Sequence, residues 1–189
     1  MISREAHEEL MKKWPGRIYA TPGRVTKRLT HLEGLLPMLK GKNVLELGAN
    51  AGLHALEICK WASYYTGVEP SPAYAAQWHI TMQYNRDTAK LFPNLEHGLI
   101  RWQNIDALVA CVMLYLLEPE ELGYLRERMR DFDTVIIQER VAGRGKKGNT
   151  TNGLHTPEAI TAWLTAQGFA CYEYWHRKGK FFEIVGHRS

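Results

Sequence analysis

Residues Asn43 to Gly52, read as NVLELGANAG, decide the fold class of this chain. The run from Val44 to Leu47 is short and mostly apolar, as in a buried strand, and it leads directly into a turn that contains two glycines. Gly48 permits a sharp turn and a close approach of the backbone to a ligand. The glycine at position 52 allows the next helix to start close to the strand. The stretch therefore predicts a strand, a ligand-binding turn and a helix.

Outward from this turn, strand-like apolar runs alternate with helical patterns of about 10 to 15 residues, which is typical of βαβ units and a parallel sheet. Two final strands around Lys178-Gly179 predict an antiparallel hairpin. We expect helices at residues 3–13, 25–39, 53–62, 72–85 and 119–130, and another that starts at residue 156. We expect strands at residues 44–47, 64–68, 107–114, 134–138, 169–175 and 180–185, with a weaker candidate at 96–102.

The composition indicates one soluble domain. The chain has 189 residues, of which 45% are hydrophobic and 23% charged, so it can bury a core. We expect an N-terminal helical cap or arm over residues 1–40, followed by the main domain over 41–189. No apolar run is long enough to cross a membrane, and the charged N-terminus lacks the apolar region of a signal peptide.

The cysteines and histidines predict a reducing compartment and no metal site. The three cysteines, Cys59, Cys111 and Cys171, are odd in number and far apart, which argues against a disulfide framework and favours the cytoplasm. No pair of cysteines or histidines has the spacing of zinc ligands, so we expect no bound metal.

Two acidic residues indicate what the turn binds. Glu46 stands two residues before Gly48, where a carboxylate would repel a phosphate but suit an amine. Glu69 follows the second strand, where an acid can accept hydrogen bonds from both hydroxyls of a ribose. A nicotinamide dehydrogenase is disfavoured, because the turn lacks the third glycine of the dinucleotide fingerprint. A ligand with a ribose, an amine and no pyrophosphate is needed, and S-adenosylmethionine meets this description.

The segments LELGANAG and GVEPS resemble motifs I and II of the class I S-adenosylmethionine-dependent methyltransferases, and the resemblance extends over residues 41–187. It implies a Rossmann-like α/β three-layer sandwich with a mostly parallel seven-stranded sheet in the order 3-2-1-4-5-7-6. The residues that it implies for cofactor binding are Glu46, Gly48, Asn50, Gly52, Glu69 and Pro70.

Later segments extend the resemblance. Residues 106–115 resemble the fourth strand and its Leu-Tyr end, and residues 133–138 resemble the fifth strand. GVEPSPAYAAQW, VMLY and the helix after LHTP are also similar to the methyltransferases that form 5-oxyacetic acid at the wobble uridine of tRNA. That likeness implies that Tyr115 lies near the transferred methyl group. The residue that contacts the adenine of the cofactor is either Asn104 or Asp106, and the sequence leaves this choice open.

The groups that act on the acceptor are less well defined. Tyr115, Glu139 and His155 are the candidates for a general base at the carboxyl ends of the strands. Basic residues in two segments predict an anionic acceptor such as RNA, a nucleotide or an acidic metabolite; we expect it to contact Arg17, Arg24, Arg144 and Lys146. The alternative is a scaffold or sensor that binds the cofactor without catalysis.

Overall fold

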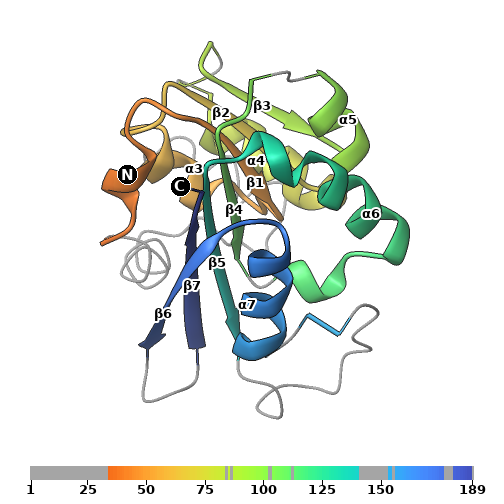
Figure 1. Ribbon diagram of the computed structural model, residues 1–189. Coiled ribbons are helices and arrows are strands. Elements are labelled where there is room, and N and C mark those ends of the chain that lie inside the picture. Colours follow the sequence, from red (N-terminus) through yellow and green to blue (C-terminus); the bar gives the residue numbers. More distant parts are fainter. Residues whose placement is uncertain are drawn as a thin grey trace.

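The sheet has seven strands in the order β3-β2-β1-β4-β5-β7-β6, as the family resemblance implies (Figure 1). The computed structural model describes residues 34–83, 85, 87–101, 104–111, 113–140, 153–154, 156–176 and 181–188. The strands are β1 (Asn43–Leu47), β2 (Tyr64–Val68), β3 (Ala89–Phe92), β4 (Ala107–Cys111), β5 (Thr134–Arg140), β6 (Ala170–His176) and β7 (Phe181–His187).

The strand directions confirm the expected mixed sheet. β1 pairs in parallel with β2 on one side and with β4 on the other, so the carboxyl ends of these strands meet at one edge. β5 pairs antiparallel with β7, and β7 pairs antiparallel with β6, which is the predicted C-terminal hairpin. The order changes direction at β1, and the turns after β1 and β4 lie at this point of the sheet.

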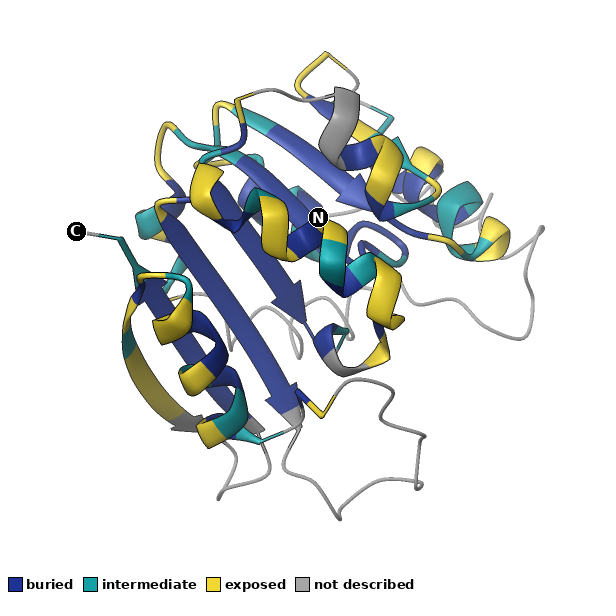
Figure 2. Ribbon diagram, turned by 45° about the vertical axis from the view of Figure 1, so that its right-hand side comes forward, coloured by how far each residue is buried: buried dark blue, intermediate teal, exposed yellow. Residues whose placement is uncertain are grey.

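Helices cover both faces of the sheet (Figure 2). Strand residues alternate between the faces, so Leu45 and Leu47 of β1 belong to one buried cluster and Val44 belongs to the other. The helical elements are η1 (Leu36–Leu39), α3 (Leu53–Ile58), α4 (Pro72–Thr81), α5 (Leu95–Arg101), η2 (Leu114–Leu116), α6 (Pro119–Arg128), η3 (Met129–Asp131) and α7 (Pro157–Ala166).

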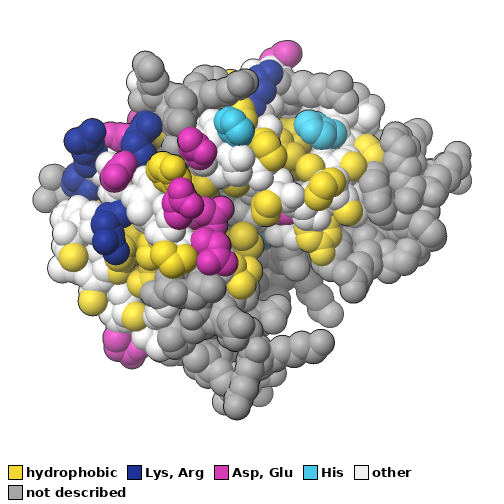
Figure 3. Space-filling model, turned by 90° about the vertical axis from the view of Figure 1, so that its right-hand side faces the viewer, with side chains coloured by type: hydrophobic (Ala, Val, Ile, Leu, Met, Phe, Trp, Pro, Cys, Tyr) yellow, Lys and Arg dark blue, Asp and Glu magenta, His cyan; other side chains and the backbone are white. Residues whose placement is uncertain are grey.

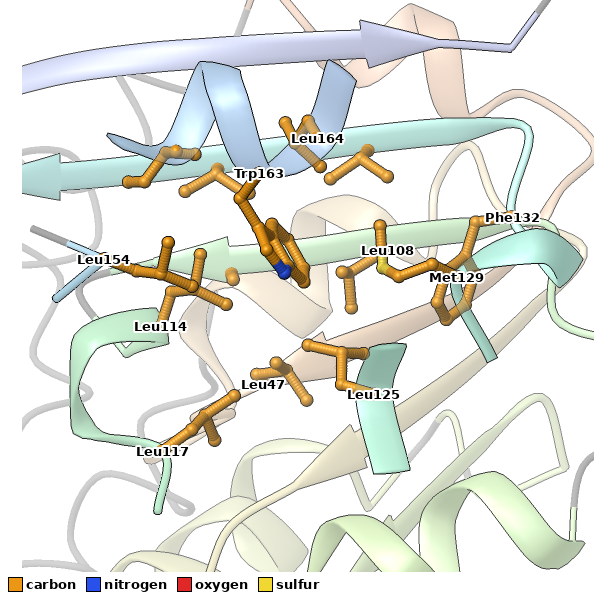
Figure 4. Close-up of a cluster of buried hydrophobic side chains, with 14 of the residues drawn as sticks. Leu47, Leu108, Leu114, Leu117, Leu125, Met129, Phe132, Leu154, Trp163 and Leu164 are labelled. Carbon is orange, nitrogen blue, oxygen red and sulfur yellow. The ribbon is translucent and has the colours of Figure 1, made fainter. Parts of the chain in front are cut away.

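One cluster lies beneath α5, α6 and α7, and the other lies beneath η1, α3 and α4. In the first, Trp163 reaches from α7 toward the side chains of the sheet, among Leu47 and Leu108 (Figure 4). The helices α3, α4, α6 and α7 begin where the sequence predicts. Thr156 caps α7, because its hydroxyl oxygen accepts a hydrogen bond from the Ala159 amide at 3.2 Å, and Pro157 occupies the first turn.

The expected strand at 96–102 is wrong. Residues 95–101 form α5, and the third strand is the earlier segment Ala89–Phe92. Leu95 and Gly98 are three residues apart and both buried, which is helical spacing. The side-chain oxygen of Asn94 accepts a hydrogen bond from the His97 amide at 2.9 Å, which stabilises the first turn of this helix.

The N-terminal cap falls mostly outside the described residues. Of the helix expected at 25–39, the structure describes only the end, where Leu36–Leu39 form the short helix η1 and Leu36 and Leu39 are buried. Within the described part of the chain, no helix is long and apolar enough to cross a membrane.

Candidate functional site

The turn after β1 has an unusual backbone. Gly48 has φ of +71°, Asn50 of +49° and Gly52 of +81°, so three residues of five adopt left-handed conformations. Asn50 tolerates this conformation better than most residues with a side chain, and its side-chain Nδ2 donates a hydrogen bond to the Gly48 carbonyl at 2.8 Å. The predicted sharp turn is therefore present.

Neighbouring side chains also require the glycines. A Cβ atom on Gly48 would lie 2.1 Å from Cγ of Met113, and one on Gly52 would lie 3.0 Å from Cδ1 of Trp78. Met113 follows β4 and Trp78 belongs to α4. The glycine turn therefore fits closely between the residues that follow β4 and the helix that follows β2.

Glu69 joins the end of β2 to this turn. The residue is buried, and its two carboxylate oxygens accept hydrogen bonds from the Asn50 amide at 2.9 Å and from the Ser71 amide at 2.8 Å. Burial raises the pKa of Glu69, and the two amide groups oppose that shift. An ionised carboxylate offers about four acceptor positions, so positions remain for hydroxyl groups of a ligand. Pro70, between Glu69 and Ser71, is exposed at the same edge.

Asn94 is a candidate that the sequence interpretation missed. The Glu69 amide donates to the carbonyl of Phe92, the last residue of β3, at 3.0 Å. Asn94 follows two residues later and therefore lies at the same carboxyl edge as Glu69. Misplacing the third strand hid this residue, although the pair Pro93-Asn94 before a helical pattern is an ordinary sign of a helix start.

Asn104 and Asp106 lie at the opposite edge of the sheet. One carboxylate oxygen of Asp106 accepts a hydrogen bond at 2.9 Å from the amide of Asn43, which starts β1. β1 and β4 are parallel, so the start of β4 is separated from the glycine turn by the length of a five-residue strand, about 16 Å at ~3.3 Å per residue. Asn104 is exposed in the segment that leads to this end. The structure therefore does not bring these two residues together with Glu69.

Glu46 lies inside the protein. Its side chain is fully buried, one oxygen accepts a hydrogen bond from the Tyr65 hydroxyl, and the other lies 2.8 Å from Nδ1 of His54. Both carboxylate oxygens of Glu46 therefore already have partners within the chain. The predicted contact of Glu46 with the amine of a ligand stays a prediction.

Cys111, the last residue of β4, completes a buried polar group with Glu46, His54 and Tyr65, which we call the Glu46 cluster. Burial lowers the pKa of His54, but Cys111 and Glu46 raise that pKa by more, and the net result is a pKa of about 10. Burial raises the pKa of the Cys111 thiol, and His54 opposes that shift. The 2.8 Å contact between His54 and Glu46 is an ion pair when the imidazole is protonated, and such a pair reduces the cost of burying each charge.

Glu139 supports the segment that follows β4. The residue is buried, and one of its carboxylate oxygens accepts hydrogen bonds from the amides of Met113 at 3.0 Å and Leu114 at 2.9 Å. These bonds hold the start of η2, which contains the backbone of Tyr115. Two of the predicted base candidates, Glu139 and Tyr115, therefore belong to adjacent elements at the carboxyl edge.

Two substitutions test whether Glu139 only holds the backbone at Met113 and Leu114 or also acts as a general base. Glu139→Ala leaves two amide groups without their acceptor, and we expect a loss of about 1 to 3 kcal/mol of unfolding free energy for each buried unpaired group. Glu139→Gln keeps an oxygen that can accept both bonds, so its stability in chemical denaturation should stay near that of the wild type. The exposed change Glu173→Gln is the control. If the stable glutamine variant loses the activity of this site by about 100-fold or more, Glu139 acts as a base. If the variant retains that activity, Glu139 is a support.

The other predicted residues lie outside the described residues. These are His155 and the basic residues Arg17, Arg24, Arg144 and Lys146. Their roles stay predictions from the sequence.

No protein-family model matches the chain, and no curated protein matches it in sequence. Its structure, however, is similar to solved structures over most of both chains. DhpI in complex with SAH matches with a TM-score of 0.65 and 16% identity, over 98% of this chain and 94% of that one. A SAM-dependent methyltransferase from Aquifex aeolicus matches with a TM-score of 0.66 and 14% identity, over 89% and 99%.

Magnesium protoporphyrin IX methyltransferase from Synechocystis PCC 6803, with bound SAM, matches with a TM-score of 0.64 and 13% identity, over 98% of this chain and 90% of that one. The chain has the class I methyltransferase fold. In an open sheet of the class I methyltransferase fold, ligands bind at the carboxyl ends of the strands near the change in strand order. The glycine turn, Glu69, Asn94 and Glu139 all lie at that edge.

Proposed function

We propose that this chain is a methyltransferase that uses S-adenosylmethionine. The observation that carries the proposal is Glu69, a buried carboxylate at the end of β2 whose oxygens bind the Asn50 and Ser71 amides and still have acceptor positions. A glycine turn with left-handed residues stands beside it. Similar structures are described with bound SAM or SAH, which supports the same cofactor here.

Each part of the cofactor has a proposed partner. The ribose hydroxyls donate to Glu69, and Pro70 flanks them. The backbone at Gly48, Asn50 and Gly52 lies against the amino-acid end, with the buried Glu46 beneath the turn. Asn94 lies where a residue after β3 can contact the adenine, in place of Asn104 or Asp106.

Methyl transfer requires alignment more than activation. When bound, S-adenosylmethionine would supply a methyl group whose carbon–sulfur bond breaks as the acceptor atom bonds to the methyl carbon, which would leave the neutral thioether S-adenosylhomocysteine. The sulfonium is already a good leaving group, so positioning supplies much of the rate. A hydroxyl acceptor also loses a proton, for which Tyr115, Glu139 and His155 are the proposed bases.

The acceptor is proposed to be anionic, on the basis of Arg17, Arg24, Arg144 and Lys146. One face disfavours such a molecule. Acidic side chains gather on the side that α5 and α6 occupy (Figure 3), and the charges of Glu96 and Glu120 raise the pKa of Tyr124 there. We therefore expect an anionic acceptor to avoid that face.

Transfer of a labelled methyl group tests the proposed function. Wild-type protein is mixed with labelled S-adenosylmethionine and a cell extract in a single turnover, with samples treated with RNase or protease. We expect label in one class of macromolecule or in small molecules. Cofactor binding without transfer to any fraction would favour the scaffold or sensor. Absence of binding would contradict the proposal.

A further inference from the structure

Three side chains of metal-ligand type converge below the glycine turn. Glu46 comes from β1, His54 from α3 and Cys111 from the end of β4. One ligand atom from each lies within 4.8 Å of the others. We propose that Glu46, His54 and Cys111 form a binding site for a divalent cation of the zinc type, a property that is separate from the proposed methyl transfer.

The kinds of ligand select the metal. Thiolate, imidazole and carboxylate together suit Zn²⁺ and its spectroscopic substitute Co²⁺, whereas Mg²⁺ and Ca²⁺ prefer oxygen ligands alone. Bonds of about 2.0 to 2.3 Å in a tetrahedral site place ligand atoms roughly 3.3 to 3.8 Å apart. The widest separation of 4.8 Å exceeds this spacing by roughly 1 to 1.5 Å, and the 2.8 Å contact between Glu46 and Nδ1 of His54 is shorter than it. Side-chain rotations of this size would bring the three ligand atoms to the spacing of a metal site.

Surrounding groups favour such a site. The Tyr65 hydroxyl donates to the Glu46 oxygen that does not contact His54, which fixes the carboxylate as an outer partner of a metal site would. Cys111 and Glu46 are buried, while the side chain of His54 is 12% exposed and gives the cation a way in. Three protein ligands leave a fourth position for water. Binding displaces the thiol proton of Cys111 and a proton of the imidazole.

The bound cation would add a further link among three elements that are already in contact, since β1 pairs with β4 and Glu46 of β1 contacts His54 of α3. β1, α3 and β4 enclose the turn that we propose for the cofactor, and the ligands are spread over 66 residues of sequence, from position 46 to position 111. We expect its binding to stabilise the fold, because the three ligands come together only in the folded chain.

Cobalt binding gives a direct test. The full chain is treated with a chelator, dialysed and titrated with Co²⁺ while its absorption spectrum is recorded. We expect one equivalent to bind and to produce a sulfur-to-cobalt charge-transfer band in the near ultraviolet. Zn²⁺ should then abolish the band by competition and raise the thermal unfolding midpoint.

Substitutions assign the ligands. Cys111→Ser should remove the charge-transfer band, and His54→Gln should weaken Co²⁺ binding by more than about 100-fold, because even outer partners contribute about 10- to 100-fold. Cys171→Ser on β6 is the matched control and should keep the band. No band in the wild-type protein, or a band that persists in Cys111→Ser, would overturn the site. The wild-type measurement decides even if a variant does not fold, and it does not depend on cofactor binding.

Discussion

Replacing Glu69 with alanine should lower the affinity for S-adenosylhomocysteine by at least about 100-fold. Two charge-assisted hydrogen bonds from ribose hydroxyls are worth about 1.5 to 3 kcal/mol each, and a tenfold change in affinity corresponds to about 1.4 kcal/mol. Glu69 is buried beside the glycine turn, so few other groups can replace it. Isothermal titration calorimetry with the product cofactor gives the dissociation constant.

The carboxylate also binds two backbone amides, so its loss affects the fold as well. Glu69→Gln separates the two effects, because its single oxygen keeps one acceptor and it should show an intermediate affinity. Glu127→Ala, an exposed acid on α6, is the matched control for charge. Unchanged affinity in a folded Glu69→Ala protein would remove the ribose assignment.

Gly48→Ala should be destabilising and should also prevent cofactor binding. At φ of +71° a residue with a Cβ costs about 1 to 2 kcal/mol. The added carbon would lie 2.1 Å from Cγ of Met113, and such overpacking typically costs about 1 to 3 kcal/mol. We therefore expect the free energy of unfolding to fall by about 2 to 5 kcal/mol in denaturant titrations.

A second glycine provides the comparison. Gly123 lies in α6 with nothing within 4 Å of an added Cβ, so Gly123→Ala should stabilise the protein, by up to about 1 kcal/mol. Adding Met113→Ala to Gly48→Ala should recover the part of the loss that comes from the collision, but not the backbone part. Wild-type stability in the single Gly48→Ala variant would mean that the turn does not have the described conformation.

The sequence was informative where local pattern and local structure coincide. NVLELGANAG predicts β1, the turn and the start of α3, because a buried strand and residues with left-handed backbone leave clear marks in composition. Proline after a capping residue likewise predicts the starts of α4 and α7. The order of the strands depends on contacts between distant parts of the chain, which local patterns do not reveal. It is predicted only by the resemblance to the class I methyltransferases.

The errors arose where burial outweighs local preference. β3 has only four residues, including an exposed lysine at position 90, so its pattern is weak, while the apolar residues of α5 imitate a strand. With β3 misplaced, the sequence leaves the adenine contact open between Asn104 and Asp106 and does not mark Asn94, which follows β3, as a candidate. The Glu46 cluster was also hidden, because its members come from separate elements and share no spacing.

Met113 links three positions that would have to change together if the site were redesigned. Its side chain fills the space that a Cβ atom at position 48 would need, and its amide donates a hydrogen bond to Glu139, so the turns after β1 and β4 and the end of β5 depend on one another. An engineer who wants a new acceptor preference should therefore randomise positions 48, 113 and 139 in one combined library. Libraries that vary one of these positions alone would mostly yield destabilised proteins. A change at one position leaves the other two packed around the original side chain.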